Sequence, residues 1–139
     1  MRNLLVYNFE ILDEEEIFVK SGIIIYMFDS FKSLRTFDKL RIRKNKGLFY
    51  RGSTYIEKEN ITKLKKIVSS WKELFNEASE EFILTGFFNE KLDKYERSNY
   101  NKNEVVESLE NLITLCEKAE KENKTIRCRK ITVRMENNK

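Results

Sequence analysis

The chain of 139 residues contains no histidine and no proline. Without histidine it cannot supply the imidazole base of a Ser-His-Asp or Cys-His site, nor a histidine ligand for zinc. The four glycines, at positions 22, 47, 52 and 86, do not cluster, which excludes a glycine-rich phosphate-binding loop. Lysine, tyrosine and carboxylates remain for catalysis, but these absences favour a non-catalytic protein that needs no cofactor.

Cysteine is also scarce, and Cys116 and Cys128 match no metal-binding or redox spacing. Each falls on the apolar side of an expected helix or strand, so we interpret both as buried, reduced thiols. The N-terminal residues 1–8 turn polar too early for a signal peptide. The longest apolar run, residues 23–28, is far too short to span a bilayer. We therefore expect a cytoplasmic protein with no membrane contact.

The length fits one domain, and the hydrophobic periodicity predicts a single α+β domain over residues 1–139. Two long stripes of apolar residues at 3-4 spacing predict amphipathic helices, and shorter alternating or apolar runs predict strands. We expect a mostly antiparallel sheet with both helices packed on one face. The expected strands cover 4–11, 17–28, a hairpin within 40–50, 81–88, 94–100 and 126–135; the expected helices cover 60–78 and 101–122.

Local residue patterns add detail to this prediction. The β-branched and aromatic run within 17–28 favours a central strand, and Asn45-Lys46-Gly47 has the composition of a hairpin turn. Asn60 is the expected N-cap of the first long helix. Gly86 predicts a β-bulge, and a change of alternation at Arg129-Lys130 predicts another.

The charge is unevenly placed along the chain, although the net charge is only +4. Residues 32–72 hold thirteen Lys/Arg and three Asp/Glu, a net charge of +10, which leaves −6 elsewhere. Such asymmetry indicates a charged macromolecular partner, most simply a cognate protein. Basic and aromatic side chains on the expected hairpin would equally suit RNA or DNA, or form an ordinary solvated face. The candidate partner-binding residues are Arg41, Arg43, Lys44, Lys46, Tyr50 and Arg51.

Other charged groups are weaker candidates. The acidic turn 13–16 has the oxygen ligands that a divalent cation takes, but such a turn is more often solvated. The first long helix begins with lysines and the second carries glutamates, which would give the molecule a polar axis for steering a partner. A second basic set near the C-terminus would extend the hairpin patch if the last strand lay beside it. That set consists of Arg127, Arg129, Lys130 and Arg134.

The C-terminal half carries a resemblance. Glu81-Phe82-Ile83-Leu84-Thr85-Gly86 is followed by Tyr95, by Asn101-Lys102-Asn103-Glu104-Val105-Val106 and a helix to Ala119, and by a strand at Ile126. This order resembles small immunity proteins of bacterial polymorphic toxin systems. The resemblance implies a cytoplasmic protein that blocks a cognate toxin by tight binding. It carries over no functional residue, because the matching positions are those of core and turn.

Overall fold

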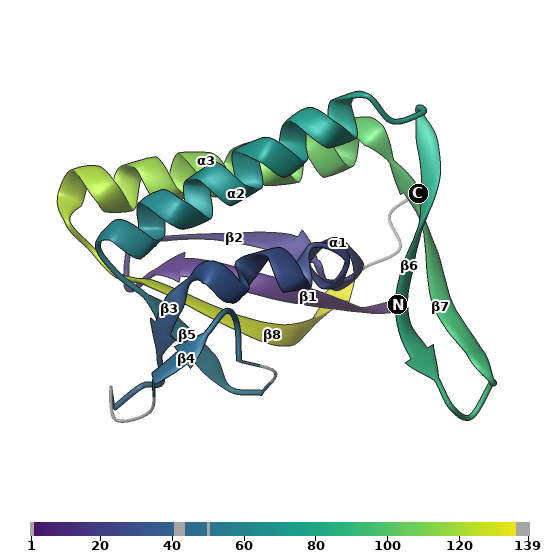
Figure 1. Ribbon diagram of the computed structural model, residues 1–139, viewed down its shortest axis with the longest axis horizontal. Helices are drawn as coiled ribbons and strands as arrows, with labels where there is room; N and C mark the ends of the chain where they lie inside the picture. Colours follow the sequence, from purple (N-terminus) through teal and green to yellow (C-terminus); the bar gives the residue numbers. More distant parts are fainter. Residues whose placement is uncertain (1, 41–43, 50, 136–139) are drawn as a thin grey trace.

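The computed structural model describes residues 2–40, 44–49 and 51–135. The elements follow in the order β1 (Arg2–Ile11), β2 (Glu15–Lys20), α1 (Ser21–Tyr26), η1 (Phe28–Ser33), β3 (Arg35–Phe37), β4 (Lys44–Lys46), β5 (Ser53–Ile56), α2 (Glu59–Asn76), β6 (Glu81–Asn89), β7 (Lys94–Asn101), α3 (Lys102–Glu122) and β8 (Ile126–Met135). Six strands form an antiparallel sheet in the order β2-β1-β8-β5-β3-β4, and β6 and β7 pair separately. The predicted α+β class is confirmed (Figure 1).

The helices cover one face of the sheet, which we call the inner face. Along β1, Tyr7, Phe9 and Ile11 point to that face and are almost fully buried. They join one core cluster with the apolar stripes of α2 and α3, of which Leu64 and Leu109 are members. Because side chains alternate along a strand, the residues between them must lie on the opposite, outer face.

The apolar run after β2 is helical, so the strand predicted over 17–28 is right only to residue 20, and it lies at the edge of the sheet and not at its centre. The strand ends at Lys20, and α1 follows directly. Within α1 and the next residue, Ile23, Ile24 and Met27 are buried at helical spacing. A Cβ at Gly22 would overlap the Tyr100 hydroxyl. The run was ambiguous because an apolar segment of this length fits a strand or a buried helix equally well.

The strand found within 40–50 pairs with a different segment from the one predicted. β4 pairs with β3, so Asn45 and Lys46 lie in a strand and not in a turn. Gly47 follows the strand and has the positive φ, 81°, that glycine tolerates. Asn60 lies inside the first turn of α2 and its Oδ1 accepts a hydrogen bond from the Arg35 amide, so it is not the N-cap.

The last strand and the β6–β7 pair test the two predicted bulges. β8 pairs with all ten residues of β1 in one continuous register, so the bulge at Arg129-Lys130 is wrong. Between β6 and β7 the register shifts between Thr85 and Phe88, which confirms the irregularity expected at Gly86. This two-stranded arm, residues 81–101, leaves the ends of α2 and α3 and extends past the end of the sheet (Figure 1).

Candidate partner-binding surfaces

The predicted basic site is only partly placed. Arg41, Arg43 and Tyr50 lie outside the described residues. Lys44 and Lys46 belong to β4, and Lys46 is exposed opposite Arg35. The exposed Arg51 precedes β5 at the other end of the strands, near Ser53. The structure therefore does not bring Lys46 and Arg51 together.

The C-terminal basic strand does share a sheet with the predicted site. Strand pairing places Arg127 beside Tyr55 and Tyr55 beside Phe37 in one row across the outer face, and the backbone of Lys44 pairs with Phe37 at the end of that row. The row spans three strand spacings, about 14 Å at about 4.8 Å each. Two aromatic residues thus separate Arg127 from Lys44. The basic residues form two groups on one face and not one continuous patch.

Arg127 is neutralised within this face. Its guanidinium forms an ion pair and hydrogen bond with Glu10, the residue opposite it on β1. Burial alone would lower the pKa of Arg127, but the hydrogen bond and charge of Glu10, helped by Tyr55, raise that pKa above its ordinary value. Both side chains are about one-fifth exposed, at 21% for Arg127 and 19% for Glu10. This pair is a structural element of the outer face.

Arg129 differs, although it lies two residues further along the same strand and on the same face. No hydrogen bond or ion pair joins its side chain to any other described residue. The Nε atoms of both arginines are buried without a partner, but only Arg127 has a carboxylate on its guanidinium. Its neighbours in the row are Asn8 on β1 and Ser53 on β5. Asn8 is fully buried and donates to Glu16 at 2.9 Å, while its Oδ1 accepts no hydrogen bond from the described residues. A guanidinium and an amide oxygen are therefore left unpaired side by side.

The expected charge separation between the two long helices is largely cancelled. The helices lie side by side, and Lys65 of α2 is 2.8 Å from Glu120 of α3. A second pair, Lys72 with Glu110, joins the same helices at 3.4 Å. Two of the thirteen basic residues of segment 32–72 thus join α2 to α3. The polar axis expected from the sequence is correspondingly weaker.

The acidic turn is also engaged by the protein itself. Lys118 of α3 lies 3.6 Å from Glu14 and 3.0 Å from Glu15, and Lys124 pairs with Glu14. Within the described part of the chain, no group of three or more potential metal ligands occurs. The turn anchors the end of α3 to the start of β2.

The cysteines are buried as expected from their positions. Cys116 lies on the inner side of α3 and Cys128 on the inner face of β8, and both are free thiols. Burial raises the pKa of the Cys116 thiol to about 12, and burial raises the pKa of Cys128 as well. Neither thiol forms the thiolate that a nucleophile or a metal ligand requires near neutral pH.

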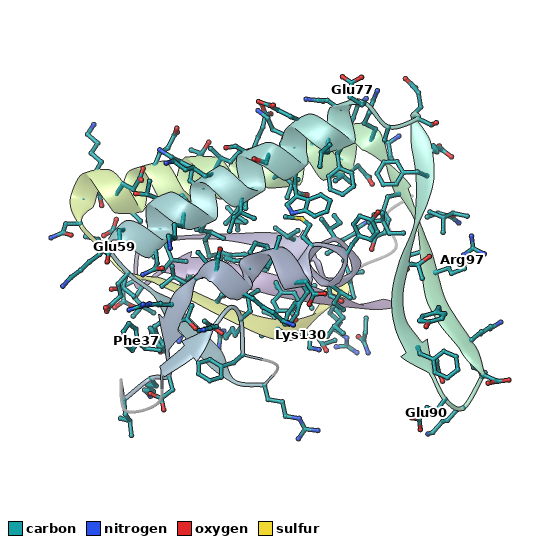
Figure 2. All side chains as sticks on the ribbon, in the orientation of Figure 1. Phe37, Glu59, Glu77, Glu90, Arg97 and Lys130 are labelled. Carbon is teal, nitrogen blue, oxygen red and sulfur yellow. The ribbon has the colours of Figure 1, made fainter. Side chains whose placement is uncertain are left out.

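The arm is the second candidate surface, and sequence reasoning missed it. Its base packs on the body through Phe82, whose ring stacks on Phe75 at 5.6 Å. Beyond that base, four large apolar side chains are between 46% and 62% exposed, namely Ile83, Phe88, Leu92 and Tyr95. The rings of Phe88 and Tyr95 meet edge to face across the two strands at 5.2 Å. Figure 2 shows Arg97 pointing outward from β7 and Glu90 at the turn.

Comparisons of the chain with protein-family models, with curated proteins and with solved structures gave no match. In the described part of the chain, the helices are too short or too polar to cross a bilayer. The two candidate surfaces therefore rest on the exposure, contacts and charges of the side chains described above.

Proposed function

We propose that this chain is a non-catalytic protein that binds a protein partner through its β6–β7 arm and neutralises that partner as a stoichiometric inhibitor of the immunity type. The observation that carries the proposal is the exposure of the apolar side chains of the arm. The resemblance of residues 81–126 to immunity proteins is the source of the inhibitor hypothesis, but it assigns no binding residue to the arm.

The physical argument rests on the free energy of exposed apolar surface. Burying a large apolar side chain stabilises a protein by roughly 1.5 to 3 kcal/mol relative to leaving it in water. Phe88, Leu92 and Tyr95 forgo about half of that stabilisation, since they are between 46% and 62% exposed. They belong to the arm, which extends beyond the six-stranded sheet (Figure 1). Contiguous exposed apolar side chains mark interaction sites, and aromatic residues dominate the binding energy of such sites.

The test is co-expression of the chain with the product of its neighbouring gene. We expect a one-to-one complex in size-exclusion chromatography and rescue of growth if that product is toxic. The double variant Phe88→Ser/Tyr95→Ser should weaken the complex about thirtyfold or more, because a central aromatic contact contributes about 2 kcal/mol or more.

Leu74→Ser is the matched control, since Leu74 is as exposed as Leu92 (62%) but lies on α2. It should leave both the complex and the rescue unchanged. Full rescue by the arm variant, or equal losses in the control, would contradict a role for the arm. A neighbouring product that neither binds nor inhibits growth would count against the inhibitor proposal itself.

Nucleic-acid binding is the second candidate function, favoured by the exposed Arg35 and Lys46 beside the row that holds Phe37 and Tyr55. Cations and rings on one sheet face suit phosphates and bases. However, Tyr55 is only 8% exposed, which leaves little of its ring for stacking. The test is the fluorescence anisotropy of labelled single-stranded RNA and DNA at low and high salt. A binding constant that falls steeply with salt would support this candidate.

A further inference from the structure

We propose that Arg129 is a carboxylate-binding site on the outer face of the sheet, which receives an Asp or Glu side chain of the protein partner. The site lies on β8, away from the arm, and nothing in the arm argument depends on it. The inference rests on the proposed function for one point, namely that the partner is a protein. Its ligand class follows from the charges and contacts of the outer face.

The first step is the contrast between two arginines of one strand. Arg127 and Arg129 point to the same face, and β1 offers Glu10 to the first and Asn8 to the second. Arg127 is therefore paired, whereas Arg129 is half-buried with no acceptor among the described residues. A partly buried guanidinium without an acceptor is unfavourable, because it has lost water contacts without replacing them. A carboxylate is the group that matches its planar donors, and it can accept two hydrogen bonds.

The surroundings of Arg129 indicate what carries that carboxylate. Ser53, half-buried beside Arg129 on β5, adds a hydroxyl that can donate to an anion. On the other side, the next outer-face positions along β8 and β1 are Ile131 and Val6. Phe18, at the edge of the same row, is 46% exposed. A cation bordered by apolar side chains fits a protein segment that presents an acidic residue among apolar ones.

The charges of this face argue against a polyanion as the ligand. Glu16 and Glu10 occupy neighbouring outer-face positions on β2 and β1, on the same side of the sheet as Arg129. Glu10 already neutralises Arg127, so the row that holds Arg129 offers one guanidinium. The exposed Arg35 and Lys46 lie on β3 and β4, and the Phe37–Tyr55 row lies between them and Arg129. A nucleic acid would bring further phosphates against these carboxylates. A single carboxylate needs only one cation, Arg129, and brings no further negative charge against Glu10 and Glu16.

The test begins with the isolated protein and acetate as the probe. Nuclear magnetic resonance observes the Nε–Hε groups of both arginines during titration with sodium acetate, with sodium chloride at matched ionic strength as reference. We expect acetate to shift the Arg129 resonance more than the Arg127 resonance, because the charge of the Arg127 guanidinium is already neutralised by Glu10 at its terminal nitrogen. A response of Arg129 that is no larger with acetate than with chloride would overturn the site.

The second measurement uses the complex with the protein partner. Arg129→Gln should weaken the complex about tenfold or more, and Arg129→Lys should recover only part of that loss because lysine lacks the planar pair of donors. Arg134→Gln is the matched control, because Arg134 is an exposed arginine of the same strand that lies on the other face of the sheet.

The two measurements separate the site from the proposed function. If acetate binds but Arg129→Gln leaves the complex unchanged, the docking role is overturned while the arm proposal stands. If Arg129→Gln abolishes binding of single-stranded RNA or DNA instead, the ligand is a phosphate and the carboxylate assignment is wrong.

Discussion

The two sides of this molecule use the same kinds of side chain in opposite ways. Beneath the helices, Leu109, Leu112 and Phe9 are fully buried in one cluster. On the arm, Leu92 and Phe88 are 62% and 46% exposed. Apolar residues stabilise the fold only where a second layer covers them, so the arm residues contribute little to stability. The difference separates residues that hold the fold from residues that are available to a partner.

The largest expected effect compares one leucine from each side. Leu109→Ala should lower the free energy of unfolding by about 2 to 5 kcal/mol, since it removes buried methyl groups and leaves a cavity. Leu92→Ala should change it by less than about 0.5 kcal/mol, as is usual for exposed positions. Urea denaturation followed by circular dichroism measures both. A loss of more than about 2 kcal/mol for Leu92→Ala would show that the arm belongs to the core.

The next prediction concerns the junction of the two regions. Gly22→Ala should lower the free energy of unfolding by about 1 to 3 kcal/mol, because the new Cβ would meet the Tyr100 hydroxyl at the base of the arm. Tyr100→Phe removes that hydroxyl and should recover part of the loss in the double variant. A double-mutant cycle from urea denaturation measures the coupling. Strictly additive effects would show that a Cβ at position 22 makes no steric contact with the Tyr100 hydroxyl.

A smaller effect distinguishes the two arginines of the outer face. Glu10→Gln should lower the free energy of unfolding by about 1 to 2 kcal/mol, because it leaves the partly buried Arg127 without its carboxylate. Arg129→Gln should lower it by less than about 0.5 kcal/mol, since no internal partner is lost. Equal losses in urea denaturation would contradict the assignment of one arginine to stability and the other to binding.

The sequence predicted the covered side of the molecule well and the uncovered side poorly. Periodicity identified α2, α3 and β1 because each buries one face. Asn101 caps α3, since its Oδ1 accepts a 3.2 Å hydrogen bond from the Glu104 amide. It predicted a strand for the apolar run that includes Ile23 and Ile24, because six consecutive apolar residues show no periodicity that separates a short helix from a buried strand. It also read β6 as a buried strand, because the sequence does not record that no third strand covers Ile83.

The candidate site shows the same limit. Sequence placed Arg129 in a basic strand, but strand pairing decides that Glu10 faces Arg127 and Asn8 faces Arg129. That pairing joins residues more than a hundred positions apart, and no local pattern specifies it. The basic segment 32–72 was visible from composition, yet Lys65 and Lys72 turn out to pair with α3. Net charge along the chain overstated the charge available to a partner.

The smallest expected effect is the pH dependence of the link between α2 and α3. Hydrogen bonds from Lys65 and then from Thr62 hold the pKa of Glu120 below its model-compound value of 4.5. A lowered folded-state pKa stabilises the fold above the unfolded value, and that contribution is lost as the pH falls through the folded-state pKa. Glu120→Gln should therefore lower the free energy of unfolding by about 0.5 kcal/mol near neutral pH and by progressively less as the pH falls below 4.5. Urea denaturation over a pH series from neutral to acidic measures the difference, and a loss that stays equal throughout would show that Glu120 acts by packing and not by charge.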